Sequence, residues 1–243
     1  MTVSDRSPYA GELVFTAFSG SHQDAIKKGL DRRNKERTEQ PDLAWGVPYL
    51  TIDPEDIGRS YEAIIRINSQ SGKGGIAYIL DREHGFDLPK TMHPQVGKCI
   101  YDLADSQSKE LDVGEIREAF FENFVNLSKP LQLIEYHLEQ SSPAQVVCHA
   151  RIILNGVEKE ISGEGNGPIN SFVHALETAG LKDFILTDYR SHAIRGGSDS
   201  DSAAYIQLRS SESKMTLWGC GVDPSIEMAG LKSLVSAYNL LHG

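Results

Sequence analysis

One short motif occurs twice in the second half of the chain, and it constrains the fold more than any other feature. The pattern G-x-G-x-x-P stands at residues 163–168 and again at 219–224. Three segments of strand-like composition precede each copy, and a helix-like pattern follows it. The sequence therefore predicts an internal duplication of a β-β-β-α unit. Because two such units can bury each other's open faces, we expect a compact domain with pseudo-twofold symmetry.

The two predicted units have matching elements. The first has strands at 131–138, 145–154 and 157–162 and a helix through residue 179; the second has strands at 184–194, 203–209 and 214–218 and a helix at 225–241. Asn155-Gly156 is a strong hairpin signal, because a type I′ turn needs a positive φ at both positions. These patterns assign residues 129–243 to the duplicated domain.

The preceding part, residues 1–128, shows mostly helical signals, which makes the whole chain α+β. Helices are expected at 22–33, 94–105 and 113–125, with a solvated helix end and loop at 34–41. Asp53 before Pro54 predicts a further helix start, because a capping side chain and a proline at the first helical position favour one. We therefore expect helical linker subdomains ahead of the duplicated domain.

Charge and cysteine usage exclude several classes of function. The chain has 24 basic and 34 acidic residues, a net charge of −10, which argues against a nucleic-acid or anionic-membrane surface. No apolar run approaches the roughly 18 residues that span a bilayer, and the N-terminal residues have no signal-peptide pattern. Three scattered cysteines fit a reducing cytosol and predict no zinc site. A cytoplasmic protein without nucleic-acid or membrane partners is expected.

The glycine motif allows two interpretations. It is not a dinucleotide fingerprint, since Pro168 stands where the third glycine belongs and an antiparallel hairpin precedes it. One interpretation is a tight strand-to-helix turn with proline at the first helical position. The other is a cradle where the N–H groups of a helix start attract a carboxylate. Ser71–Gly75 likewise lacks the order of a phosphate loop and is expected to be a turn.

No self-sufficient catalytic pattern is visible. His22 follows a Ser/Gly loop and opens a predicted helix, but lone histidines more often cap or face solvent than catalyse. The sequence contains no H-x-H, no H-E-x-x-H and no G-x-S-x-G. The residues alone therefore favour a partner or regulatory module, which leaves open a free-standing amino-acid-binding or scaffold protein.

Five segments together resemble the α-isopropylmalate synthase family: residues 11–30, 47–59, 61–80, 163–176 and 218–226. The resemblance implies an enzyme that condenses acetyl-CoA with 2-oxoisovalerate in leucine biosynthesis, on a (β/α)8 barrel holding Mg²⁺ or Mn²⁺, with leucine as inhibitor. A barrel needs roughly 250 residues. The resemblance thus implies the accessory and leucine-sensing part only, a homodimer that is inactive alone, holds no metal or cofactor and meets the substrates only through the missing barrel.

The same resemblance implies roles for particular residues. His22 and Tyr49 would reach into the active site of a neighbouring subunit. Leucine would be bound by Gly165, Asn166, Gly167, Pro168, Ile169, Leu186, Tyr189, Ala193, Ser200, Ser202 and Ile226. Citramalate and homocitrate synthases share the regulatory fold with other effectors, but the SGSHQDAI and NSQSGKGG segments favour the isopropylmalate branch.

Overall fold

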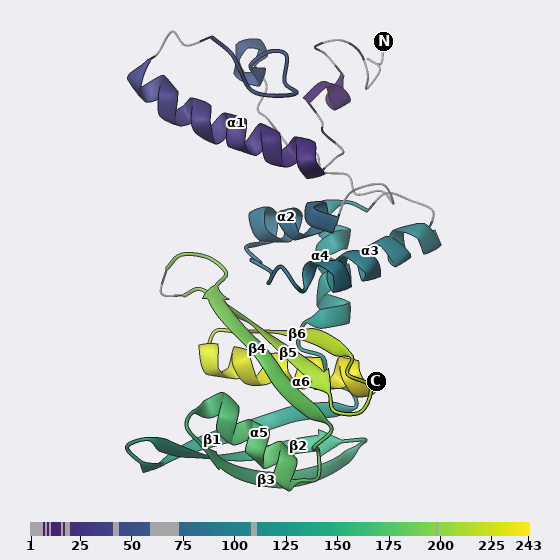
Figure 1. The fold of residues 1–243 in the computed structure, drawn as a ribbon, viewed down its shortest axis with the longest axis vertical. Coiled ribbons are helices and arrows are strands. Elements are labelled where there is room, and N and C mark those ends of the chain that lie inside the picture. Colours follow the sequence, from purple (N-terminus) through teal and green to yellow (C-terminus); the bar gives the residue numbers. More distant parts are fainter. Residues whose placement is uncertain are drawn as a thin grey trace. The chain divides into compact units, whose positions relative to one another are not determined.

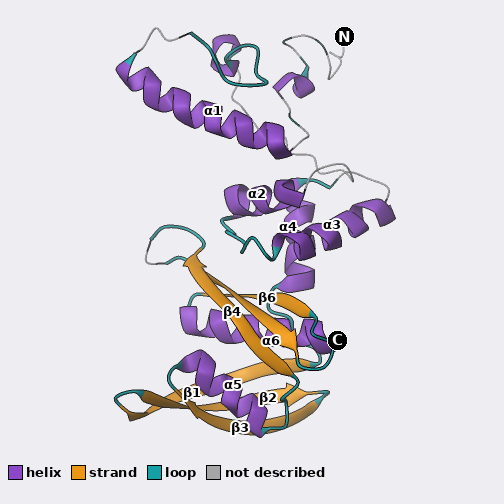
Figure 2. Ribbon diagram, viewed as in Figure 1, coloured by secondary structure: helices purple, strands orange, loops and turns teal. Residues whose placement is uncertain are grey.

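The computed structural model describes residues 7, 9, 11–15, 17, 20–40, 44–58, 73–107, 111–197 and 199–243. Packing divides the chain into two compact units, Met1–Ile79 with Gly97–Ile116 and Leu80–Val96 with Arg117–Gly243. Helices dominate the earlier part of the sequence and two antiparallel sheets the later part, so the predicted α+β class is confirmed (Figures 1 and 2). The boundary predicted between residues 128 and 129 stays a prediction, and segment 59–72 lies outside the described residues. The turn expected at Ser71–Gly75 is wrong in its described part, because residues 73–75 are the first turn of a helix.

The earlier elements are η1 (Glu12–Phe15), α1 (Gly20–Glu39), η2 (Pro54–Ile57), α2 (Lys73–His84), α3 (His93–Gln107) and α4 (Val113–Phe124). In the first compact unit, Phe15, Ile26, Val47 and Leu50 form a small core. The Asp53 carboxylate accepts the N–H of Glu55 at 3.1 Å, which confirms the predicted helix start.

Helix α1 is longer than predicted, because most of segment 34–41 is helical and not loop. The residues after Arg33 lack an apolar stripe, so no packing signal marks them as helix. They include good helix formers, and Arg32 pairs with Glu36 one turn later at 2.7 Å. Local propensity and a surface ion pair thus extend this helix into solvent.

The predicted duplication is confirmed. The first repeat consists of β1 (Leu131–Ser142), β2 (Gln145–Leu154), β3 (Val157–Gly165) and α5 (Pro168–Thr178). The second repeat consists of β4 (Phe184–Ala193), β5 (Ser202–Ser210), β6 (Thr216–Asp223) and α6 (Ile226–His242). Each forms its own antiparallel sheet, in the orders β1-β2-β3 and β4-β5-β6. Asn155 and Gly156 have φ of 50° and 80°, as the predicted hairpin turn requires.

The repeats match in fine detail. The pairing register shifts after Leu133 in β1 and after Leu186 in β4, at the same point of each first strand. This bulge leaves Tyr136 and Tyr189 in equivalent positions. The inner faces of both sheets and both helices contribute to one hydrophobic core. The pseudo-twofold relation therefore places the start of each helix near the first strand of the other repeat.

The paired glycines of both motifs lie inside strands, which corrects the expectation that they form the loops. A Cβ at Gly163 would overlap the Ala175 nitrogen of α5, and one at Gly219 would overlap the Ala237 nitrogen of α6. Gly165 and Gly221 meet the backbones of the same two helices. These four glycines let each helix lie directly on its sheet. Sequence spacing could not reveal this, since the clashing atoms belong to a later element.

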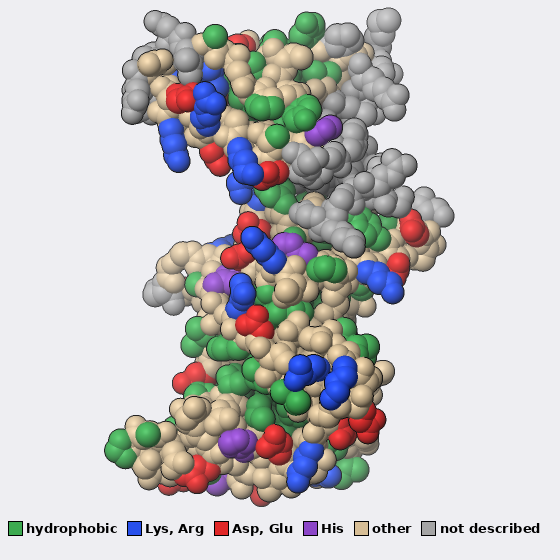
Figure 3. All heavy atoms as spheres, in the orientation of Figure 1, with side chains coloured by type: hydrophobic (Ala, Val, Ile, Leu, Met, Phe, Trp, Pro, Cys, Tyr) green, Lys and Arg blue, Asp and Glu red, His purple; other side chains and the backbone are tan. Residues whose placement is uncertain are grey.

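The surface of the described residues mixes charges of both signs. On the face drawn in Figure 3, acidic and basic side chains are interspersed. No helix among the described residues is long and apolar enough to span a membrane.

Candidate functional site

The start of α5 offers backbone donors to a ligand. Its capping residue, Gly167, has no side chain to accept the first-turn N–H groups, and Pro168 takes the first helical position. A Cβ at Gly167 would meet no atom within 4 Å, and φ there is 175°, ordinary extended backbone. The Asn170 side chain instead accepts the N–H of Asn166 at 3.1 Å, which shapes the loop. An uncapped helix start of this kind attracts an anion such as a carboxylate.

The equivalent start of α6 is occupied by the chain's own side chains. The Ser225 hydroxyl accepts the Met228 N–H at 3.4 Å, and the Asp223 carboxylate accepts the Ser225 N–H at 2.9 Å. Glu227 stands in the first turn and accepts the Tyr136 hydroxyl at 3.4 Å. Burial, with the nearby Glu227 and Asp223 charges, raises the pKa of Tyr136. Lys232 pairs with Asp223 at 2.7 Å, so the side chains around this helix start already satisfy one another and the two glycine motifs are not equivalent as sites.

Apolar side chains gather beside the open start of α5. A Cβ on Gly230 of α6 would come within 2.7 Å of Ile169 Cδ1 and 3.5 Å of the Tyr189 hydroxyl. Ile226, half exposed, lies one helical turn before Gly230 on the same face. Leu186 packs against the core on the strand that carries Tyr189. The structure thus brings several predicted effector residues together where the repeats meet.

Other predicted effector residues lie elsewhere in the second repeat. Ala193 pairs with Ser202 across β4 and β5, and four residues of strand, about 13 Å, separate Ala193 from Tyr189. The Ser200 hydroxyl accepts the Arg195 N–H at 2.8 Å and donates to the Asp201 carbonyl at 3.1 Å. Ser200 therefore already holds the β4–β5 loop together. The predicted set divides into a group around α5 and a group at the end of β4.

Sequence reasoning did not select Gly230 or Tyr136. A glycine inside a helix costs roughly 1 kcal/mol relative to alanine, so its presence in α6 was a usable signal. Tyr136 is identified by the repeat, because it is the counterpart of Tyr189. Gly230 leaves room for Ile169 beside the start of α5, whereas Tyr136 donates to Glu227 at the start of α6.

The two predicted catalytic residues meet in the first compact unit. The rings of His22, in the first turn of α1, and Tyr49 stack with centroids 4.0 Å apart and planes inclined by 27°. Tyr49 is 62% exposed and has φ of 63°, a left-handed conformation that aromatic residues rarely adopt. Gly29 allows the loop to lie close to α1, since a Cβ there would come within 2.7 Å of Pro48. The pair therefore presents an exposed, positioned imidazole and phenol.

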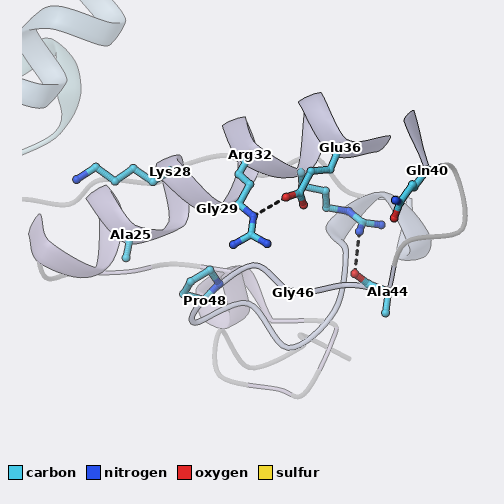
Figure 4. Close-up of a pocket in the computed structure, with 10 residues that line it drawn as sticks. Ala25, Lys28, Gly29, Arg32, Glu36, Gln40, Ala44, Gly46 and Pro48 are labelled. Atoms are coloured by element: carbon cyan, nitrogen blue, oxygen red, sulfur yellow. Dashed lines mark hydrogen bonds and ion pairs between the residues drawn. The ribbon is translucent and has the colours of Figure 1, made fainter. Parts of the chain in front are cut away.

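A groove of about 590 Å³ runs beside α1 in the same unit (Figure 4). Its cations are already paired: Arg32 contacts Glu36 at 2.7 Å and Lys28 contacts Asp24 at 2.7 Å. Arg33 donates to the Ala44 carbonyl at 3.1 Å. The groove therefore presents no concentrated positive charge. Within the described part of the chain, no cluster of three or more His, Cys, Asp or Glu side chains could hold a metal ion.

Two family models match the sequence. Residues 12–81 match "Alpha-isopropylmalate synthase, post-catalytic domain-like", and residues 110–242 match "LeuA allosteric (dimerisation) domain". Proteins named 2-isopropylmalate synthase are similar over 98% of this chain: 42% identical in Mycobacterium leprae, 43% in Mycobacterium ulcerans and 43% in Clostridium acetobutylicum. The match covers 40%, 43% and 43% of those proteins, so the chain spans about two fifths of their length.

Proposed function

Because this chain belongs to the family of the LeuA allosteric (dimerisation) domain, we propose that it is the accessory and leucine-sensing part of a 2-isopropylmalate synthase. The observation that carries the proposal is the contrast between the two helix starts. The start of α5 has no side-chain cap, and its residue Ile169 packs close to Gly230 of α6. At the start of α6, by contrast, the side chains of Asp223 and Ser225 accept backbone N–H groups. One leucine per chain is therefore expected, although the motif occurs twice.

The site matches the chemistry of leucine. The α-carboxylate would accept N–H groups at the start of α5, and the isobutyl group would contact Ile169, Tyr189 and Leu186. Burying an isobutyl group is worth about 2 kcal/mol, so leucine should bind roughly ten to a hundred times more tightly than alanine. A second copy of the chain would supply Ala193, Ser200 and Ser202, which lie at the end of β4, in the following loop and at the start of β5, too far from Tyr189 to join the same ligand in one copy.

In the complete enzyme, His22 and Tyr49 would assist catalysis in a neighbouring subunit. An exposed imidazole stacked on a phenol can hold or move a proton at an active site that another subunit provides. The condensation of acetyl-CoA with 2-oxoisovalerate, and its Mg²⁺ or Mn²⁺, would belong to a catalytic barrel. The described residues do not fit such a metal, so no step involving it is assigned to this chain.

Calorimetry on this chain tests the leucine site, and Gly167 is the position to change. Since a Cβ at Gly167 meets no atom, Gly167→Asp should keep the fold but repel the carboxylate and lower affinity at least tenfold. Gly167→Asn, of the same size without the charge, is the matched control and should bind more tightly than Gly167→Asp. Gly165→Asp is unsuitable, because any side chain there meets the α5 backbone.

The following results decide the proposal. Asp223→Asn, at the blocked helix start, should leave leucine affinity unchanged. Absence of leucine binding, or equal affinity in Gly167→Asp and wild type, would refute the leucine site. Tight binding of another amino acid in place of leucine would favour a citramalate or homocitrate synthase relative, and binding without any effect on a synthase would favour a free-standing module.

A further inference from the structure

Two side-chain amides close the free edge of β6. Gln95, in the first turn of α3, donates to the Trp218 carbonyl at 3.1 Å and accepts the Trp218 N–H at 2.9 Å. Asn126, just after α4, donates to the Val222 carbonyl at 3.0 Å and accepts the Val222 N–H at 3.0 Å. Each amide therefore takes the place of the peptide group of a neighbouring strand. We call these two residues the edge lock.

Further contacts hold the same segments on the second repeat. The Asn126 N–H donates to the Cys220 carbonyl at 3.0 Å. The Asp87 N–H donates to His192 Nε2 at 3.3 Å, so Nε2 is an acceptor, and Nδ1 lies 3.1 Å from the Ala193 carbonyl as donor. A Cβ on Gly85 would overlap the Ile194 carbonyl. Segments 80–96 and 117–126, the docked segments, thus bind both β6 and β4.

The docked segments cover the central part of one sheet face. Tyr205, Trp218 and Cys220 point away from the shared core, yet each is at most 1% exposed. Phe86 contacts Phe120 and Phe121 edge-on or tilted, so aromatic rings pack the two docked segments against each other. On the corresponding face of the first repeat, the His149 and Glu139 side chains are 53% and 70% exposed. The pseudo-symmetry is therefore broken by what covers the two sheets.

We propose that Gln95 and Asn126 are positioning residues that make the second repeat the transmitting half of the regulatory domain. Tyr189 faces the proposed leucine site, while His192, three residues later on β4, contacts the docked segments on the opposite face. A displacement of Tyr189 when leucine binds would then reach the docked segments by two connections. One is His192 on the same strand, β4, and the other is the edge of β6, which Gln95 and Asn126 hold. The first repeat supplies the open helix start, and its paired amide comes from α6 and not from the docked segments: Asn239 donates to the Leu131 carbonyl and accepts the Leu131 N–H, each at 2.7 Å. The direction of the signal rests on the proposed leucine site, whereas the lock itself does not.

Two variants remove the lock without other damage. Gln95→Met keeps side-chain volume but cannot make the paired hydrogen bonds. Asn126 has φ of 53°, so Asn126→Gly removes the amide without straining the backbone, which alanine would do. Gln107→Ala is the matched control, because Gln107 is an exposed glutamine on the same helix α3.

Hydrogen exchange without leucine tests the lock alone. Gln95→Met and Asn126→Gly should each raise the exchange of residues 80–96 and 117–126 about tenfold, while β2 and the Gln107→Ala variant keep wild-type exchange. Single-tryptophan variants carrying Trp45→Phe give a second measurement, since Trp218 fluorescence should shift to longer wavelength when the docked segments detach. Unchanged exchange and fluorescence in both lock variants would overturn the lock.

Leucine addition tests transmission. In wild type, leucine should slow exchange at residues 80–96 as well as around α5. In Gln95→Met, calorimetry should give wild-type leucine affinity, with protection around α5 but none at 80–96. Protection of 80–96 in the variant equal to wild type would overturn transmission through the lock. If wild type binds no leucine, the proposed function fails, and the experiment without leucine still decides the lock.

Discussion

Single residues carry the clearest signs of function. Tyr49 combines a left-handed backbone, high exposure and a stacked histidine, and packing stability explains none of the three. Unfavourable conformations of about 1 kcal/mol or more persist where the surroundings impose them, often at functional sites. The Val47 and Leu50 side chains anchor the loop on both sides of Tyr49. The fold therefore holds an aromatic ring out toward solvent.

The first residue-scale prediction concerns this stack. His22→Ala and Tyr49→Phe should change the free energy of unfolding by no more than about 0.5 kcal/mol, since both side chains are exposed. In a complete synthase, either change should lower kcat more than it alters inhibition by leucine. Urea unfolding and steady-state kinetics measure the two effects. Wild-type kcat in both variants would remove these residues from the active site.

A second residue-scale prediction concerns alkaline pH. Burial raises the pKa of the Cys148 thiol to about 11, and burial also raises the pKa values of Cys220 and Tyr205. The folded state therefore keeps these groups protonated after the unfolded chain has lost its protons. Stability should be level below about pH 8.5 and fall as pH rises toward 11, with about 2–3 kcal/mol of the loss due to Cys148. In urea titrations, Cys148→Ala should be less stable at neutral pH but show a shallower alkaline decline; an equally steep decline would contradict this.

At the scale of elements, a strand could be predicted where the signals for it lie within a few neighbouring residues. The Asn155-Gly156 turn and the β-branched content around it gave β2 its observed bounds, Gln145–Leu154. The glycine motif was misplaced, because the need for Gly163 and Gly219 arises from helices that pack on them later in the chain. The edge lock could not be predicted for the same reason, since Gln95 and Trp218 are far apart in sequence and meet only in the folded chain. Local signals find elements, whereas close approaches between elements are found only in three dimensions.

The element-scale prediction separates packing glycines from the ligand-facing glycine. Gly163→Ala and Gly219→Ala should each destabilise the protein by about 2–3 kcal/mol or more, because the added methyl group overlaps the backbone of α5 or α6. Gly167→Ala should cost no more than about 1 kcal/mol, since its methyl group meets no atom and only the preference of a helix start for glycine over alanine is lost. Urea midpoints rank the three variants. A stable Gly163→Ala protein would show that α5 can move away from its sheet at little cost.

At the scale of the whole molecule, the proposed leucine site requires a second copy of the chain. The start of α5 and Tyr189 form one group of predicted effector residues, and Ala193 and Ser202 form another at the end of β4. The family match predicts dimerisation through residues 110–242, which contain both groups. A twofold axis places the same surface patch of each copy against the other. One group from each copy can then form a single site across the interface. The sequence alone predicts the residues of the site, but it does not show that they fall into two groups.

Mixed dimers test this division. Sedimentation at micromolar concentration should first show a species of twice 26.8 kDa. Gly167→Asp damages the first group and Ala193→Asp the second, so each pure variant should bind leucine poorly. In a 1:1 mixture after subunit exchange, the heterodimer holds one site built from two undamaged groups, so about a quarter of the wild-type sites should return. Calorimetry on the mixture measures this recovery, and each variant mixed with itself is the control. If no binding returns although exchange has occurred, each site lies within a single chain.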